Sequence, residues 1–171
     1  MLPQEFINLS ALIGRDSMLV QGAGGNTSYK SDDKMWIKAS GKWLSDSMEE
    51  GIFIPVDVVK IKQNIKNNKD NPLEDSYVIN KTLRPSIETT LHALMPQKVV
   101  LHSHPINLLC LLILDDGELQ LAKLLKDFNF AWVPYARPGE ELTRKVQAVV
   151  QDRKVDVLLL GSHGLVVGGE N

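Results

Sequence analysis

Cysteine is almost absent from this sequence of 171 residues, which contains only Cys110. A single thiol excludes an internal disulfide, and it also excludes a structural zinc site closed by several cysteines. Because Cys110 lies in the apolar stretch LLCLLIL, we expect it to be a buried, unreactive thiol in the reducing cytoplasm.

Long apolar runs and a strong net charge are missing as well. No stretch approaches the roughly 20 apolar residues that a membrane-spanning helix needs, and no basic segment followed by an apolar one opens the chain. The 19 Lys and Arg residues nearly balance the 21 Asp and Glu residues, which leaves a net charge of −2. This balance favours neither nucleic acid nor an anionic membrane as a partner. We therefore expect a cytoplasmic protein that binds neither.

Helical and strand patterns alternate along the chain. The length and a hydrophobic content of 43% predict one domain over residues 1–171. Periodicity and end signals predict helices over residues 3–14, 45–50, 58–66, 86–95, 106–114, 118–126 and 138–153. Apolar runs predict strands over residues 35–41, 52–56, 99–104, 130–135 and 155–160, whereas residues 21–28 and 67–72 read as loops. This alternation is typical of an α/β fold.

The most informative segment is residues 99–105, where a short apolar run leads into the pattern His-x-His. Alternate side chains of a strand point to the same face, so His102 and His104 can offer one metal ion two imidazoles. His163 follows another apolar strand, in a GSHG turn whose glycines can expose its ring. Three histidines with an open fourth position are typical of catalytic zinc. The alternative is a pair of half-buried sheet histidines and an ordinary turn.

Glu88 is expected in the first turn of a helix that Ser86 caps. A carboxylate facing a metal-bound substrate can act as a general acid or base, and partial burial would raise its pKa toward neutrality. The alternative is a surface acid that complements the helix dipole. His92 follows four residues later on the same helical face, where it can hold the carboxylate or make a structural hydrogen bond.

Two further segments can bind an anion through their backbone. GAGGN, residues 22–26, is either a flexible turn or a nest of N–H groups around an anion. It has neither the ending of a Walker loop nor the spacing of a dinucleotide fingerprint. Ser40 and Gly41 offer a second set of donors.

Together, GAGGNTS, KASG, PSIE, HSHP and GSHGLVVGG resemble the motifs of the class II aldolase/adducin family, of which the fuculose-phosphate aldolases are members. The motifs occur in the family's order over residues 22–169. The resemblance implies an α/β fold of three layers, α/β/α, around a mainly antiparallel sheet, and a homotetramer. It also implies one Zn²⁺ per subunit on His102, His104 and His163, with Glu88 as the catalytic acid or base.

The resemblance places a substrate phosphate on a set of small and polar residues: Gly25, Asn26, Ser40, Gly41 and Ser86. The aldolases carry two serines before the acid, whereas Ile87 replaces the second serine here. This implies a weaker grip on phosphate or a different anionic end on the substrate. Family members also continue into closing helices and a C-terminal tail, and we expect this chain to lack that tail.

The activity that the resemblance implies is that of a lyase in carbohydrate metabolism. Zinc would support cleavage or formation of a C–C bond in a small ketose phosphate through a metal enediolate. Dehydratase, decarboxylase and 4-epimerase reactions of the same family stay open, although the epimerases have an aspartate at the position that resembles Glu88. A non-catalytic, adducin-like binding module without the metal histidines is the alternative of another class.

Overall fold

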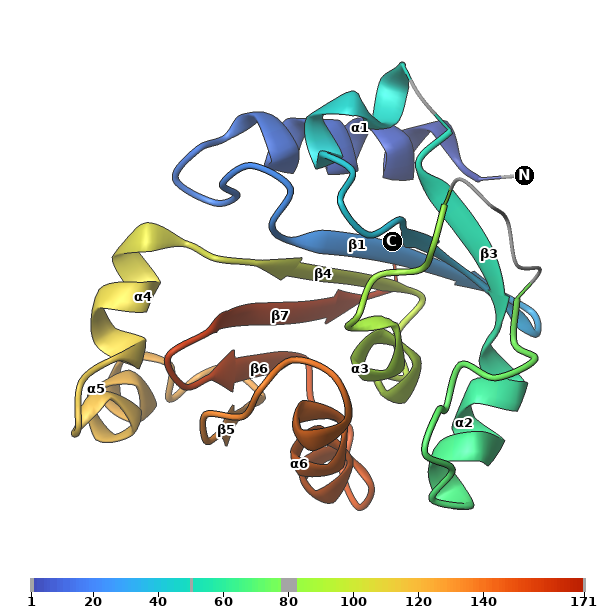
Figure 1. Cartoon of the computed structure of the whole chain (residues 1–171). Helices are drawn as coiled ribbons and strands as arrows, with labels where there is room; N and C mark the ends of the chain where they lie inside the picture. The colour runs from blue at the N-terminus through green and yellow to red at the C-terminus, as the bar shows by residue number, and fades with distance from the viewer. Residues whose placement is uncertain (1, 50, 78–82, 171) are drawn as a thin grey trace.

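A single seven-stranded sheet runs through the computed structural model, which describes residues 2–49, 51–77 and 83–170 (Figure 1). The strands are β1 (Asn26–Ser31), β2 (Lys34–Lys38), β3 (Phe53–Asp57), β4 (Val99–Ser103), β5 (Phe130–Val133), β6 (Val157–Leu160) and β7 (Gly164–Gly169). Their order is β3-β2-β1-β4-β7-β6-β5, and every neighbouring pair is antiparallel except the parallel pair β5 and β6. The predicted α/β fold with a mainly antiparallel sheet is confirmed.

Helices cover both faces of this sheet, which gives three layers (Figure 1). They are α1 (Gln4–Arg15), α2 (Val58–Lys66), α3 (Thr89–Leu94), α4 (Ile106–Leu112), α5 (Gly117–Leu124) and α6 (Glu140–Val150), with a short 3-10 helix η1 (Leu44–Met48). α2, α3 and α6 lie against one face, while α1 and η1 lie against the other. α4 and α5 pack on β5, β6 and β7 through an apolar cluster of their own.

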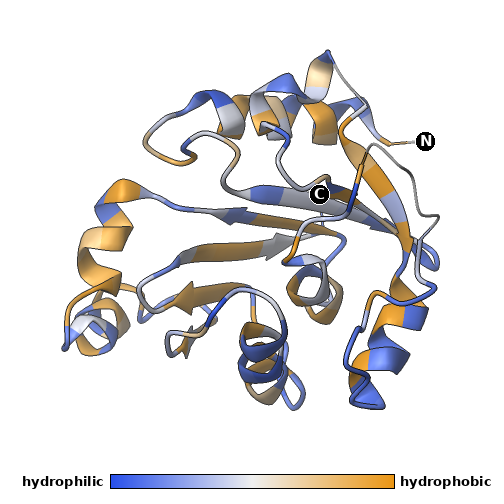
Figure 2. Ribbon diagram, in the orientation of Figure 1, coloured by the Kyte–Doolittle hydropathy of each residue, from blue (hydrophilic) through white to orange (hydrophobic). Residues whose placement is uncertain are grey.

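The apolar core is clearest at β6, because this strand is buried on both faces. Leu158 and Leu160 point into the cluster that includes residues of α3 and α6, whereas Leu159 packs with α4 and α5. A strand covered on both sides reads as a continuous apolar run, which explains why it was predicted from the sequence. Figure 2 shows β6 and β7 as predominantly hydrophobic.

β1 and β7 were not predicted as strands. The segment over residues 21–28 was expected to be a loop, but β1 begins at Asn26. Its side chains are polar because they meet polar partners on both faces: Thr27 lies 2.8 Å from the Ser10 hydroxyl, and Ser28 lies 2.8 Å from His92 Nδ1. The hydrophobic pattern that normally marks a central strand is therefore absent from β1.

Cys110 is exposed on α4, so the expectation of a buried thiol is wrong. α4 is apolar except for the exposed Asn107, and it buries Leu112 while Cys110 and Ile106 face outward. Among the described residues, we find no helix with the length and hydropathy that crossing a membrane requires.

Candidate active site

Three histidines from β4, the residues just after it and the β6–β7 turn come together in the structure. His102 lies near the end of β4, and His104 follows directly after that strand. β7 pairs with β4, with Val166 opposite His102, and this pairing brings the β6–β7 turn and His163 alongside. The ligand atoms of the three residues lie within 4.8 Å of one another. The predicted convergence of the three imidazoles is confirmed.

Close packing around these rings requires a glycine at position 164. A Cβ on Gly164 would lie 2.5 Å from the Ser103 carbonyl oxygen and 2.9 Å from Cδ2 of His104. Both distances are shorter than a real Cβ contact, so any larger residue would push the β6–β7 turn away from β4. Gly164, the second glycine of GSHG, therefore allows the rings to lie close to one another.

Two of these imidazoles, those of His102 and His104, are in the protonation state that a metal ion needs. His102 Nδ1 lies 3.0 Å from the Leu165 carbonyl oxygen, so it donates its N–H and leaves the lone pair on Nε2, 3.0 Å from His104 Nε2. Burial lowers the pKa of His102 to about 4 and also lowers that of His104, so both are neutral at pH 7. Bonds of about 2.0–2.1 Å to a tetrahedral Zn²⁺ would separate ligand nitrogens by about 3.4 Å. The three residues therefore fit a divalent cation.

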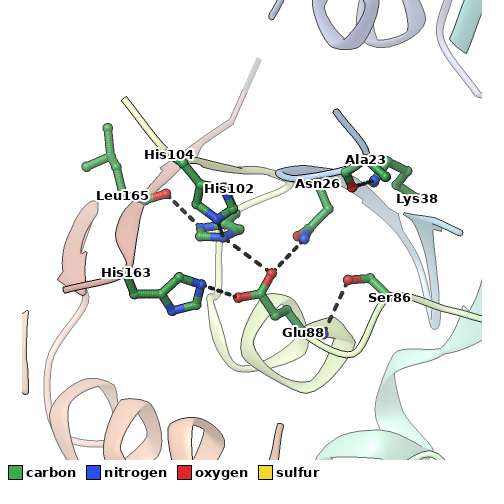
Figure 3. A network of polar contacts seen from close by, with 9 residues as sticks. All are labelled: Ala23, Asn26, Lys38, Ser86, Glu88, His102, His104, His163 and Leu165. Carbon is green, nitrogen blue, oxygen red and sulfur yellow. Dashed lines mark hydrogen bonds and ion pairs between the residues drawn. The ribbon is translucent and has the colours of Figure 1, made fainter. Parts of the chain in front are cut away.

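Glu88 lies among these histidines, as Figure 3 shows. It occupies the N-cap of α3 rather than the first turn, and it is only 6% exposed. Its Oε1 lies 3.2 Å from His163 Nε2, and its Oε2 lies 3.3 Å from His102 Nε2. Asn26 Nδ2 donates a hydrogen bond of 2.7 Å to Oε2. The carboxylate thus faces the same centre as the imidazoles, which a surface acid would not.

These neighbours keep Glu88 ionised. Burial raises the pKa of Glu88. The interaction with His102, which is protonated only at acidic pH, and the contacts with His163 and Asn26 outweigh this effect of burial and hold the pKa below its usual range. The expected shift toward neutrality is therefore wrong in direction. At neutral pH the side chain is a carboxylate that can accept a proton.

Ser86 does not have the position expected of it, whereas His92 has one of the roles predicted for it. The Ser86 hydroxyl accepts a hydrogen bond of 3.3 Å from the Glu88 backbone N–H, two residues before the N-cap of α3, so Ser86 is not the helix cap. His92 Nδ1 lies 2.8 Å from the Ser28 hydroxyl. Of the two roles predicted for His92, the structural hydrogen bond is the one found.

A cavity of about 220 Å³ adjoins the histidines and Glu88. Its lining includes all the residues that the resemblance assigns to phosphate, namely Gly25, Asn26, Ser40, Gly41 and Ser86, together with Glu88, His104 and His163. Gly25 has a φ of 59°, and a Cβ there would lie 2.9 Å from the His102 carbonyl oxygen. This glycine therefore lets the glycine-rich loop turn tightly against β4.

Lys38 also lines this cavity, and the sequence reasoning missed it. The side chain is only 2% exposed, and its ammonium donates to the carbonyl oxygens of Ala23 and Lys42 at 2.8 and 2.6 Å. It thereby ties the glycine-rich loop to the turn after β2. Burial lowers its pKa to about 8, while the charge of Glu88 acts in the opposite sense. The available signal was a lysine directly before Ala-Ser-Gly in an otherwise apolar strand.

Comparisons with known proteins bear on the fold and on the site. A profile of the family described as Class II Aldolase and Adducin N-terminal domain matches residues 4–171. The N-terminal class II aldolase domain of a conserved protein from Thermoplasma acidophilum is 32% identical, with a TM-score of 0.83 over 98% of this chain and 83% of that one. L-fuculose-1-phosphate aldolase from Thermus thermophilus is 17% identical, with a TM-score of 0.63 over 99% and 82%, which is a likeness of fold alone.

A curated relative extends well beyond this chain. The Bacillus subtilis (strain 168) protein named "Uncharacterized oxidoreductase YuxG" is 34% identical over 183 residues, which cover 98% of this chain and 26% of that protein. This chain therefore spans about a quarter of the length of that relative.

Proposed function

Because this chain belongs to the class II aldolase and adducin N-terminal domain family, we propose that it is a metal-dependent lyase that cleaves or forms a C–C bond in a small ketose phosphate. One observation carries the proposal: the ionised Glu88 is held between imidazoles that share a centre suited to a divalent cation. A cation and a carboxylate at one cavity are what proton transfer next to a polarised carbonyl requires.

His102, His104 and His163 would hold the cation, one per subunit. We propose Zn²⁺, because three imidazoles with an exchangeable fourth position are typical of catalytic zinc. When bound, the cation would supply Lewis-acid stabilisation of the negative charge that develops on the substrate oxygens.

Glu88 would move the proton of the reaction. In the direction of bond formation, its carboxylate accepts the proton from the carbon next to the substrate carbonyl, and in cleavage it returns that proton. The hydrogen bond from Asn26 to Oε2 orients the carboxylate, and the lowered pKa keeps it ionised at neutral pH.

The cavity beside Glu88 would bind the anionic end of the substrate. The proposed phosphate ligands are those listed above, Gly25, Asn26, Ser40, Gly41 and Ser86, and all of them line the cavity. Lys38 adds an ammonium group on the same wall, which favours a negatively charged ligand. Ile87 also lines the cavity and offers no hydrogen bond to that ligand.

Two other functions, a binding module and an oxidoreductase, fit the site less well. A non-catalytic binding module needs neither the three imidazoles nor a buried carboxylate among them. The oxidoreductase name belongs to a relative of which this chain spans about a quarter, and GAGGN lacks the spacing of a dinucleotide fingerprint. Dehydration, decarboxylation and 4-epimerisation of sugar phosphates would use the same cation and carboxylate, so a substrate panel decides among them.

We also propose that the protein assembles with copies of itself. Large apolar side chains are exposed on and after α4 and α5, among them Ile113, Leu124 and Phe128. An apolar surface of this kind is typical of a protein interface. Because an exposed thiol such as that of Cys110 stays free in a reducing compartment, we propose that the protein is cytoplasmic.

Metal analysis and turnover of three variants test the proposed function. Glu88→Gln should retain zinc and lose about 10²–10⁴-fold in kcat on the ketose phosphate that the wild type cleaves. His104→Ala should lose both zinc and turnover. Glu141→Gln, which changes an exposed glutamate of α6, is the matched control and should leave both unchanged. Undiminished cleavage by Glu88→Gln would remove Glu88 from the mechanism, and a wild type without zinc affinity would favour the binding module.

A further inference from the structure

Strand β1 and helix α3 are joined by two polar contacts, one beyond the other. Asn26 Nδ2 donates to Glu88 Oε2 at 2.7 Å, and the Ser28 hydroxyl lies 2.8 Å from His92 Nδ1. Asn26 and Ser28 are two residues apart on a strand, so they share a face; Glu88 and His92 are four apart along a helix, so they stack on one side. A step of two residues along a strand covers about 6.6 Å, and a step of four residues along a helix covers about 6.0 Å. Because these lengths are similar, a single alignment of α3 on β1 can form both contacts.

The contact between Ser28 and His92 lies below the active site rather than in it. Both residues are fully buried, and neither lines the cavity that adjoins Glu88. They cannot touch a substrate there. Any effect of this pair on the reaction must therefore pass through the other contact, between Asn26 and Glu88.

His92 is a poor choice for a position that only needs to be filled. Its Nε2 has no hydrogen-bond partner among the described residues, which costs stability in a buried site. Its helical neighbours Leu91 and Met95 belong to the apolar core, so a leucine at position 92 could join them without that cost. The polar contact with Ser28 is what an imidazole provides here and an apolar side chain does not.

Helix α3 depends on such contacts for its position. It has only six residues, and its N-cap, Glu88, makes no capping hydrogen bond with its side chain. An isolated helix of this length is not stable, so tertiary contacts decide where it lies. A shift of α3 along β1 would carry the Glu88 carboxylate away from His102 and His163.

We propose that Ser28 and His92 are positioning residues for Glu88: their contact fixes the register of α3 on β1 and so holds the carboxylate among the imidazoles. The inference rests on the proposed function only where it assigns Glu88 the proton transfer. A misplaced catalytic group lowers turnover even when nothing that touches the substrate has changed.

A set of three substitutions separates positioning from simple packing. Ser28→Ala and His92→Leu both remove the contact between Ser28 and His92. Ser28→Ala removes only one oxygen atom, so it still tests the proposal if His92→Leu does not fold. His92→Asn keeps a polar atom close to the place of Nδ1 and should restore the contact. Zinc affinity should stay within about threefold of wild type in all three, below the 10–100-fold loss typical when a ligand loses its own partner.

The first measurement does not depend on turnover. The NMR resonances of the Asn26 side-chain amide report its hydrogen bond to Glu88. They should move in Ser28→Ala and His92→Leu and return toward wild type in His92→Asn. A folded Ser28→Ala protein with unchanged Asn26 resonances would overturn the proposal, whatever the enzyme assay shows.

The second measurement is turnover of the zinc-loaded protein. Ser28→Ala and His92→Leu should lower kcat about 10–100-fold with little change in KM, and His92→Asn should recover most of the loss. In a Glu88→Gln background, the same substitutions should lower kcat no further. An equal loss in that background would show that the pair acts elsewhere. A wild type that turns over no ketose phosphate would refute the proposed function, and the Asn26 resonances would still decide the positioning role.

Discussion

Two regions of the molecule bury their side chains with opposite chemistry, and we call them the apolar half and the polar half; β2 and β3, at the far edge of the sheet, have an apolar cluster of their own. In the apolar half, around β5, β6 and α6, buried residues such as Val133, Val146 and Leu158 belong to one apolar cluster. In the polar half, around β1, the end of β4 and α3, the buried residues include Ser28 and His102. Figure 2 shows the contrast between hydrophobic β6 and the more polar β1.

The difference in chemistry between the two halves shows where the protein is less stable because of its candidate active site. Among the residues described, five buried side-chain atoms lack a hydrogen bond. Those of Asn26, Glu88 and His92 lie in the polar half, that of His163 lies beside it in the β6–β7 turn, and only that of Gln97 lies away from the site. The Glu88 atom, Oε1, is still within 3.2 Å of His163 Nε2. Each such atom destabilises the folded protein, and in natural proteins such costs concentrate at functional sites. Substitutions in the two halves should therefore separate stability from function.

The largest effect on stability is expected in the apolar half, from Leu158→Ala. Leu158 is fully buried in β6, so the free energy of unfolding should fall by about 2–5 kcal/mol, as measured by urea denaturation. The zinc affinity of the folded variant should not change, because the histidines lie on other elements. Leu12→Ala, at an exposed position of α1, is the control and should stay within about 0.5 kcal/mol of wild type. Weakened zinc binding in folded Leu158→Ala protein would show that the apolar half also affects the site.

Acid should destabilise the polar half before it affects the apolar half. Burial lowers the pKa of His102 from its ordinary 6.5 to about 4 in the folded chain, so the unfolded chain binds the proton first as the pH falls. The stability from neutral His102 is thus complete above pH 6.5 and lost between about 6.5 and 4, a difference of about 3 kcal/mol. Unfolding of the chelator-treated protein at pH 7 and pH 4 measures it.

His102→Gln provides the control for this pH dependence, since it keeps a polar side chain but does not titrate. Its stability should fall less between pH 7 and pH 4 than that of the wild type. The lowered pKa of His92, also due first to burial, acts in the same direction, so part of the dependence should remain. If the free energy of unfolding fell equally between pH 7 and pH 4 in the two proteins, His102 would not be the group responsible.

The same contrast explains what could be predicted from the sequence. β6 was found because burial against apolar neighbours leaves a visible pattern, here the run VDVLLL. α6 was found from the start signal of a helix, the acidic first turn after Pro138-Gly139. β1 was missed because a central strand with polar partners on both faces has no such pattern. Lys38 was missed for a related reason: a lysine is expected in solvent, and only its contacts with two carbonyl groups make its burial possible.

The proposed metal ligands were found from residue type and, for two of them, from local spacing. His102 and His104 are close in sequence, so strand geometry alone brings them together. His163 reaches them only because β7 lies next to β4, and no local spacing encodes that order of strands. The resemblance to the class II aldolase/adducin family, rather than local spacing, supported His163 as the third ligand. The pKa of Glu88 could not be predicted, because its direction depends on contacts from three separate elements.

The smallest expected effect concerns Ile87, an apolar side chain at the cavity of the polar half. It is 62% exposed and lines the cavity at the position where the resemblance expects a second serine. Ile87→Ser would add one donor for an anion, worth about 1 kcal/mol at an exposed site, so the Kd for inorganic phosphate should fall about fivefold. Ile87→Val keeps the position apolar and should leave that Kd unchanged. Because Ile87 is exposed, both variants should unfold within about 0.5 kcal/mol of wild type. Equal phosphate affinity in the two variants would mean that position 87 does not face the anion, and that the polar half binds its ligand without help from this residue.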